Sequence, residues 1–544
     1  MREVTDPEAE DRKPQSDEAH SAFAPVGGIE PAPAPEAEEP TSEFTIPEGL
    51  RIPPAPEADS SAFTAPQRYQ HAVFTPPEGT PTVRLTKGAP WQDQMRTMLR
   101  TPAAERPAAE PTQRHEDEGP AVPRVLDLTL RIGELLLAGG EGAEDVEAAM
   151  FAVCRSYGLD RCEPNVTFTL IAISYQPSLV DDPVTASRTV RRRGTDYTRL
   201  QAVYQLVDDI SAEDIDVSLE EAYRSLAQIR RNRHPYPGWV LTFASGLLAG
   251  SASVLVGGGA AVFFAAMAGA MLGDRLAWLA AGRGLPEFYQ FVVAAMPPAA
   301  IGVALTLVHS DLRGSAVITG GLFALLPGRA LVAGVQDGLT GYYITAAARL
   351  LEVMYFFVAI VIGVLTVLYV GAQLGAELDP DATLRVTERP VVQIVASITL
   401  SLAFAVLLQQ ERASVLVVML NGGVAWTIFG AMRYAGDIEP VASTAVAAGV
   451  VGLFGQLFSR YRFSSALPYV TAAIGPLLPG SATYFGLLYI SQENLNDGLA
   501  SLTRAVATAM AIAIGVNLGS EISRLLLRVP DAATRRAAKR TRGF

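Results

Sequence analysis

Residues 325–328 read Leu-Leu-Pro-Gly, and the same four residues return at 477–480 of this 544-residue chain, an offset of 152. Three further matches keep this offset without a gap: Ala330 with Ala482, Gly334 with Gly486, and 362–364 (Ile-Gly-Val) with 514–516. Self-similarity at a fixed offset is typical of a duplicated structural unit. The sequence therefore predicts two copies of one unit in its C-terminal part.

Both copies lie in a region that begins at Trp239, where charged residues become sparse and apolar runs reach membrane length. A helix needs about 20 apolar residues to cross a bilayer. We therefore expect an all-α polytopic membrane domain of about ten spans. The spans are expected near 239–257, 261–281, 288–308, 314–334, 344–370, 390–409, 413–432, 440–458, 466–490 and 498–523.

The placement of arginines predicts how these spans are oriented. Arginines at 230, 231 and 233 precede the first span, and five basic residues between 535 and 542 follow the last. Both termini are therefore expected in the cytoplasm of a multi-pass plasma-membrane protein, and an acidic loop at 371–389 outside. Each copy then holds five spans, an odd number, so the second copy is inverted relative to the first. Inverted repeats are a recurring plan of secondary transporters.

The remaining regions differ in composition. Residues 1–120 hold 22 acidic against 11 basic residues and 20 of the 37 prolines, which predicts a disordered acidic tail. Residues 121–232 predict a small α+β domain in the cytosol. Its expected elements are helices at 125–137, 144–157, 197–210 and 219–230, a strand at 165–175 and its hairpin partner at 183–192. The membrane copies are expected at 233–370 and 390–527, and a basic tail at 528–544.

The two Pro-Gly pairs are the first candidate substrate site. Proline removes a backbone donor and glycine permits unusual dihedrals, so each pair should break its helix. A half-helix that begins there presents free N–H groups and a positive dipole end, which suit a carboxylate. The candidate substrate-binding residues are Pro327, Gly328, Pro479, Gly480, Ser481, Asn421 and Arg504. For a single break, a packing kink without a ligand is the competing interpretation.

Ionisable residues inside apolar spans are costly to bury and mark functional sites. Asp337 follows the first break by about three turns, and Arg349 and Glu352 lie three residues apart on one helix, close enough to pair. Asp337 and Glu352 are the candidate proton-coupling carboxylates. Glu141, Glu144, Asp145 and Glu147 gather at the start of a predicted helix, where acids favour the helix dipole.

No Gly-x-Ser-x-Gly motif, Walker loop or zinc-type spacing occurs in the sequence. We therefore expect no cofactor, no metal, no nucleic-acid partner and no ATP-driven chemistry in this chain. The expected partners are a small amino-acid substrate, protons and the lipid bilayer, with a homo-oligomer left open.

Residues 121–527 resemble the threonine/serine exporter (ThrE) family. The resemblance rests on the stretch LDLTLRIGELLLAGGEGAEDVEAAM at 126–150, on the strand VTFTLIAIS at 166–174, and on the Leu-Leu-Pro-Gly elements with Gln336-Asp337-Gly338. It implies export of threonine and serine driven by the proton-motive force, without an enzymatic activity. Three alternatives remain open: a small-dicarboxylate (succinate-like) exporter, a membrane-anchored hydrolase acting through 121–232, and a sensor that uses its tail to bind partners.

Overall fold

A computed structural model describes residues 95–96, 98–99, 122–178, 180–190, 194, 196–212, 217–232, 235–308, 313–376, 389–462 and 465–527. The predicted tails at 1–120 and 528–544 lie outside these residues, apart from 95–96 and 98–99, and so does most of the loop expected at 371–389.

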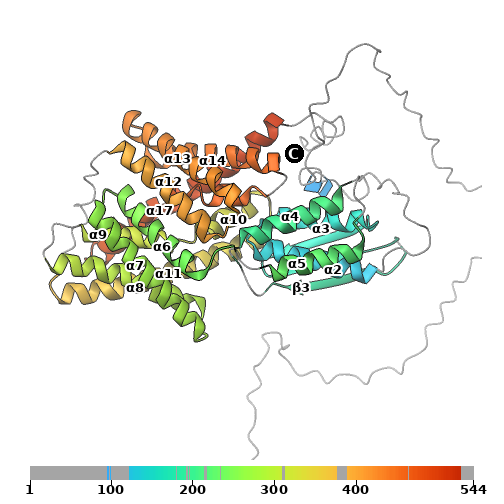
Figure 1. Ribbon diagram of the computed structural model, residues 1–544, viewed down its shortest axis with the longest axis horizontal. Coiled ribbons are helices and arrows are strands. Elements are labelled where there is room, and N and C mark those ends of the chain that lie inside the picture. Colours follow the sequence, from blue (N-terminus) through green and yellow to red (C-terminus); the bar gives the residue numbers. More distant parts are fainter. Residues whose placement is uncertain are drawn as a thin grey trace, which may run out of the picture. The chain divides into compact units, whose positions relative to one another are not determined.

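The first part of the chain folds as an α/β domain of four helices and one antiparallel sheet with the strand order β1-β2-β3 (Figure 1). Its elements are α2 (Val122–Ala138), α3 (Ala143–Ser156), β1 (Cys162–Thr167), β2 (Leu170–Tyr175), β3 (Val184–Thr189), α4 (Tyr197–Ser211) and α5 (Leu219–Arg231). The four helices confirm the predicted ones to within a few residues at each end.

The expected single strand at 165–175 is wrong, because the segment folds back on itself. β1 and β2 pair with each other, Thr167 opposite Leu170, around a two-residue turn of Phe168 and Thr169. Phe168 has a φ of 45°, in the left-handed region, where such turns usually carry glycine or asparagine. Since neither Phe168 nor Thr169 is a typical turn residue, the local sequence did not predict the turn. The predicted partner strand does pair with β2, as β3.

From Gly238 on, the chain forms a helical domain whose two halves have matching elements. The first half contains α6 (Gly238–Leu255), α7 (Ala260–Gly282), α8 (Glu287–Leu307), α9 (Gly314–Phe323), α10 (Gly328–Leu339) and α11 (Tyr343–Gln373). The second half contains α12 (Pro390–Leu407), α13 (Arg412–Gly430) with η3 (Ala431–Ala435), α14 (Pro440–Arg462), α15 (Leu467–Thr471), η4 (Gly475–Leu477), α16 (Gly480–Ser491) and α17 (Leu495–Leu527).

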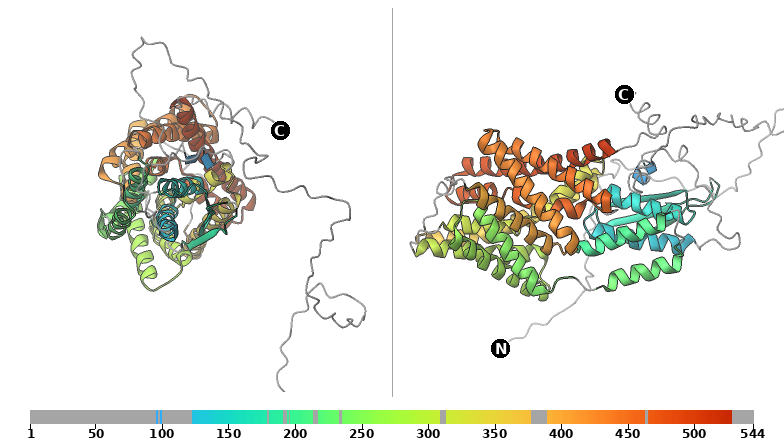
Figure 2. Two further views of the ribbon diagram at one scale, coloured as in Figure 1. Left: turned by 90° about the vertical axis from the view of Figure 1, so that its right-hand side faces the viewer. Right: turned by 45° about the horizontal axis from the view of Figure 1, so that its top comes forward.

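The helix starts of the two halves keep the sequence offset of 152. It separates the first residues of α6 and α12, of α7 and α13, of α10 and α16, and of α11 and α17. Figure 1 and the right-hand view of Figure 2 show most helices of the first half (green to yellow) on one side of the helical domain and most of the second (orange to red) on the other.

Within the described residues, eight helices are long and apolar enough to cross a membrane, and the bent pair α9 and α10 gives a ninth span if counted as one. The axes of α9 and α10 differ by 52°. The remaining expected span, the ninth along the chain near 466–490, forms no single long helix but three short pieces, α15, η4 and α16, so ten spans stay a prediction. Prolines at 476 and 479 interrupt the helix there, since each lacks a backbone donor, whereas Pro468 lies in the first turn of α15, where proline is tolerated.

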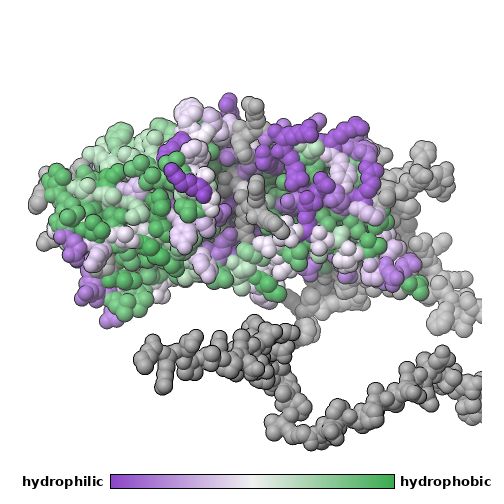
Figure 3. Space-filling model, turned by 90° about the horizontal axis from the view of Figure 1, so that it is seen from below, coloured by the Kyte–Doolittle hydropathy of each residue, from purple (hydrophilic) through white to green (hydrophobic). Residues whose placement is uncertain are grey.

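The surface of the helical domain is strongly apolar. Apart from Leu170, Val180 and Val184, the exposed large hydrophobic side chains all lie at Trp239 or beyond, with Phe264, Trp278 and Tyr343 among the most exposed. On the face in Figure 3, hydrophobic residues gather over the helical domain, and hydrophilic residues over the α/β domain. An apolar surface of this extent indicates contact with lipid.

Candidate functional site

Two glycines bring the start of α3 against the end of α10. α2 ends at Ala138, and Gly140 has a φ of 91°, which a side chain would strain. At Gly142, an added Cβ would lie 3.3 Å from the side-chain nitrogen of Gln336 and 3.5 Å from a carboxylate oxygen of Asp337. The backbone of Gly142 therefore lies nearly in van der Waals contact with these two side chains of α10.

A buried ion pair lies at this contact. The Asp337 carboxylate accepts a hydrogen bond of 2.8 Å from the backbone N–H of Ala143, the first residue of α3, and lies 3.2 Å from Nε of Arg349 on α11. Asp337 is 0% exposed and Arg349 is 4% exposed. Arg349 also donates a 2.6 Å hydrogen bond to the backbone carbonyl of Glu141. Asp337 thus caps α3, where the helix dipole favours a negative charge, and its charge is compensated by Arg349.

The Glu141 side chain connects the same segment to the second half of the helical domain. Its two carboxylate oxygens accept from the hydroxyl of Ser465, each at 3.0 Å. Burial raises the pKa of Glu141 to about 6, against the effect of hydrogen bonds from Ser465 and Tyr204 and of the charges of Arg96 and Arg349. Acidic residues that sequence reasoning assigned to the helix dipole therefore make interdomain contacts.

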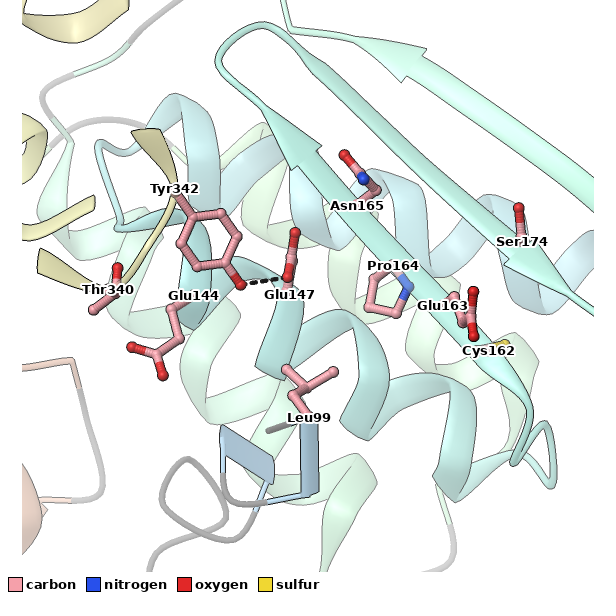
Figure 4. Close-up of a pocket in the computed structure, with 10 residues that line it drawn as sticks. All are labelled: Leu99, Glu144, Glu147, Cys162, Glu163, Pro164, Asn165, Ser174, Thr340 and Tyr342. Carbon is pink, nitrogen blue, oxygen red and sulfur yellow. Dashed lines mark hydrogen bonds between the residues drawn. The ribbon is translucent and has the colours of Figure 1, made fainter. Parts of the chain in front are cut away.

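Glu147, one turn further along α3, occupies a cavity of about 420 Å³ beside the turn between α10 and α11. Figure 4 shows the Tyr342 phenol directed at its carboxylate, with which it forms a hydrogen bond. The backbone N–H of Val166 donates to the other oxygen at 2.8 Å. Burial is the main reason why the pKa of Glu147 is raised to about 7; the carboxylates of Glu144 and Asp337 act in the same direction, and the two hydrogen bonds oppose it.

The two Pro-Gly breaks have the same local structure. Pro327 has φ −79° and ψ 52°, and Pro479 has φ −81° and ψ 48°. In each copy the glycine N–H donates across the proline to a leucine carbonyl, at 2.8 Å from Gly328 and 2.9 Å from Gly480. These are inverse γ-turns. Each turn starts a helix of 12 residues, α10 or α16.

The structure also brings the two breaks together. An added Cβ on Gly328 would lie 3.0 Å from the Leu478 side chain, and one on Gly480 would overlap the ring of Phe323. Each helix start therefore packs against an apolar residue that precedes the break in the other half.

The other predicted site residues lie in different places. Ser481 is half-buried in the first turn of α16, and Glu352 is half-buried on α11. The sequence suggested that Arg349 pairs with Glu352. In the structure, Arg349 forms its ion pair with Asp337 instead. Asn421 is buried on α13 and donates to the carbonyl of Val451 at 3.3 Å. Arg504 is exposed on α17.

Sequence reasoning missed Tyr342 and Ser465, which lie in short turns without a motif. It also gave no reason to connect Glu141 and Glu147 with the helical domain, because these partners are about 200 to 320 residues apart in the sequence. Among the described residues, no group of three His, Cys, Asp or Glu side chains could hold a metal ion.

Comparisons with known proteins assign both halves of the chain to one kind of protein. The family described as "Putative threonine/serine exporter" matches residues 127–371, and the family described as "Threonine/Serine exporter, ThrE" matches residues 393–522.

Two curated relatives cover most of the chain. A "Probable threonine/serine exporter" of Mycobacterium tuberculosis is 34% identical over 405 residues, which cover 73% of this chain and 76% of the relative. A "Threonine/serine exporter" of Corynebacterium glutamicum is 30% identical over 434 residues, covering 77% of this chain and 86% of the relative. Both relatives are named as exporters rather than enzymes. No solved structure matches the chain significantly.

The buried pair Asp337 and Arg349 should be strongly coupled in stability. Removing one charge leaves the other buried without compensation, so Asp337→Leu and Arg349→Leu should each destabilise the protein by about 3–5 kcal/mol. The double variant should cost clearly less than the sum of the two. Thermal unfolding of the purified protein measures this cycle, and Arg433→Gln, which removes the exposed pair with Asp437, is the control expected to change little. Additive losses would show that the two charges do not compensate each other.

Glu147 should make the protein less stable as the pH rises. Its pKa is about 7 in the folded state against an ordinary value of 4.5, so the folded state binds more protons between these two pH values. By linkage, its contribution to stability falls as the pH rises through this window. Glu147→Gln should therefore flatten the dependence of the melting temperature on pH between 5 and 8, whereas Glu163→Gln, an exposed residue of the same cavity, should leave it unchanged. An equal slope in both variants would contradict the assignment.

Proposed function

The chain belongs to the threonine/serine exporter family, and from this premise we propose that it exports threonine and serine by alternating access between two inverted five-span halves, driven by the proton-motive force. The relatives are exporters and the helical domain carries membrane-length apolar helices, so the protein is a multi-pass membrane transporter and not an enzyme. The substrate, the driving force and the inverted arrangement are the proposal.

The contacts of the α/β domain support ten spans with both termini in the cytoplasm. That topology places the turns before α8, α11, α13 and α15 on the cytoplasmic side. Three of these four turns hold hydrogen bonds to the α/β domain: Tyr342 with Glu147, the carbonyl of Leu408 with the N–H of Tyr197, and Ser465 with Glu141. A cytosolic domain reaches only turns on its own side of the membrane, and the proposed topology puts these three turns there.

The matching helix starts and the paired breaks support the inverted halves. If each half has five spans, the second enters the membrane from the opposite side, and α10 and α16 then point their first turns toward each other from opposite directions. The contacts of Gly328 with Leu478 and of Gly480 with Phe323 have this reciprocal form. Related sites in transporters lie near the bilayer midplane between the repeats.

The substrate carboxylate is proposed to bind at these two helix starts, with the hydroxyl of Ser481 nearby. The first N–H groups of a helix have no intrahelical partner and favour an anion. In this conformation, Leu478 and Phe323 cover the glycines, so binding requires both side chains to move. A movement of one half against the other would do this. Arg504 and Asn421 make no hydrogen bond to either break among the described residues, and the proposal does not use them.

Asp337 and Glu352 remain the proposed proton-coupling carboxylates. Protonation of Asp337 would remove the charge that holds Arg349 and caps α3, and so would loosen the contact between α10 and the α/β domain. The charged groups that face Asp337 among the described residues are Arg349 from α11 and Glu144 and Glu147 from α3. Glu352 lies one turn beyond Arg349 on the same helix.

Export should be selective for small amino acids. Proteoliposomes that contain the purified protein should release preloaded L-threonine and L-serine at least tenfold faster than protein-free vesicles, and release succinate at the background rate. Radiolabelled substrates measure this directly. Release of succinate alone would overturn the proposal in favour of a dicarboxylate exporter.

Proton coupling should depend on at least one of the two carboxylates. Threonine efflux by the unmodified protein should accelerate when the outside is made more acidic than the inside, because protons moving inward drive the export. Asp337→Asn or Glu352→Gln should flatten this response, while Glu287→Gln, an exposed residue at the start of α8, should retain it. If neither variant changes the pH dependence, the coupling role of both residues is refuted.

A further inference from the structure

A second cavity lies between the α/β domain and the second half of the helical domain. Its volume is about 80 Å³. One wall belongs to the α/β domain and is acidic, with Glu141, Glu144 and Asp145 at the start of α3. The opposite wall belongs to α14 and α17 and carries the guanidinium groups of Arg460 and Arg524. Arg96 also lines the first wall and Glu521 the second, so acidic groups are in excess on one side and arginines on the other.

The positive wall is polar in one half of the molecule only. At the offset of 152, each of its polar residues on α14 and α17 corresponds to an apolar residue of the first half: Gln456 to Ala304, Ser459 to Leu307, Arg460 to Val308, Asn517 to Leu365, Ser520 to Leu368, Glu521 to Tyr369 and Arg524 to Ala372. In the first half, Leu307, Leu365 and Leu368 belong to a packed apolar cluster. The packing of these helices therefore does not require polar residues at the three positions equivalent to these leucines, 459, 517 and 520, whereas Val308 and Tyr369 are exposed.

The polar wall is also costly to maintain. Polar and charged side chains that leave water lose free energy unless they find partners. Arg524 shares its guanidinium with Glu521, and Asp145 pairs with Arg96 at the opposite edge. Glu144 and Arg460 also have partners within the protein. The first half has leucines at three of the equivalent positions, so the packing of the helices alone does not account for charges on both walls. This points to a ligand that carries both charges.

We propose that this cavity is the cytoplasmic loading site for a free α-amino acid, with its carboxylate on Arg460 and Arg524 and its ammonium on Glu141 and Glu144. The proposal rests on the export function proposed above and adds a site distinct from the two helix breaks. An α-amino acid presents its two charges on one carbon, and so can bridge two walls of opposite sign. The amides of Gln456 and Asn517 and the hydroxyl of Ser520 line the cavity and suit a hydroxyl side chain.

The size of the cavity fits a small ligand. About 10–15 Å³ of such volume holds one water molecule, so 80 Å³ holds several water-sized groups. A serine or threonine has roughly this number of non-hydrogen atoms, whereas an aromatic amino acid is larger. The cavity therefore favours the smallest polar members of the class.

The contribution of each wall to binding is tested with ligands that lack either the carboxylate or the ammonium group. Binding to the full-length purified protein is measured by calorimetry with three probes: L-threonine, L-threonine amide, which lacks the carboxylate, and the corresponding 2,3-dihydroxy acid, which lacks the ammonium. Arg524→Gln should weaken L-threonine binding at least tenfold and leave the weak binding of the amide unchanged. Glu144→Gln should weaken L-threonine binding and leave that of the dihydroxy acid unchanged. Arg433→Gln, on an exposed surface, is the matched control for all three probes.

A second variant distinguishes loss of the binding site from loss of folding. Asn517→Leu combined with Ser520→Leu introduces the residues that the first half has at the same positions, and should fold with unchanged or higher thermal stability. It should bind L-threonine at least tenfold more weakly. Retained binding in this variant, or equal losses for all three probes in the single-charge variants, would overturn the loading site.

The outcome distinguishes this inference from the proposed function. The loading site would be refuted, and the export function left intact, by one combination of results. The wild-type protein exports threonine from vesicles, and the cavity variants keep the same affinity for threonine and the same KM on the cytoplasmic side. Probe-selective loss of binding in a protein that does not export threonine would support the site and refute the export proposal.

Discussion

A proline cannot donate a backbone hydrogen bond, and a helix that meets one in its interior must break or bend. At Pro327 and Pro479, which are equivalent positions of the two halves, the helix breaks at the same inverse γ-turn and a 12-residue helix follows, whereas α8 continues through Pro297 and Pro298. Because each glycine after the proline contacts an apolar side chain of the other half, the breaks are also where the halves meet. The substrate site proposed above depends on these two positions, since the helices that begin there have first-turn N–H groups without an intrahelical partner, which a continuous helix would not offer.

The segment from Glu141 to Glu147 holds both halves at once. Glu141 binds Ser465 of the second half, and Ala143 and Glu147 bind Asp337 and Tyr342 of the first. A relative movement of the two halves must therefore stretch or break at least one of these bonds. All three involve a carboxylate that is buried or partly buried, and the pKa values of Glu141 and Glu147 are raised to about 6 and 7, close to neutral pH. The contact that resists movement between the halves is thus also one whose charge responds to small changes in pH.

The sequence predicted what depends on local chemistry and on periodicity. Membrane-length apolar runs, the two Pro-Gly breaks and the helices of the α/β domain follow from propensity and length. The breaks and these helices are present, and eight of the ten predicted spans are long apolar helices within the described residues. It failed where the deciding partner is distant or the local signal is unusual. The turn at Phe168 has no glycine, so one predicted strand became two. Arg349 had Glu352 three residues away as an obvious partner, yet it pairs with Asp337 on the preceding helix. The sequence assigned the acidic residues near the start of α3 to a favourable interaction with the helix dipole. Their partners in the helical domain lie far along the chain, so the local sequence pattern could not predict these contacts.

The two halves share a backbone plan but differ in what they place between the same helices. Between α8 and α11 lies a packed apolar cluster, whereas between α14 and α17 a charged cavity opens against the α/β domain. If the halves are inverted, these positions lie at opposite ends of the membrane. The duplication then places two equivalent helix breaks at the centre of the membrane domain. The two ends of this domain differ, since only the end that faces the α/β domain has a cavity with both charged walls. Such a division would let a symmetric movement of the two halves serve transport that is fed from one side, as the proposed loading site requires.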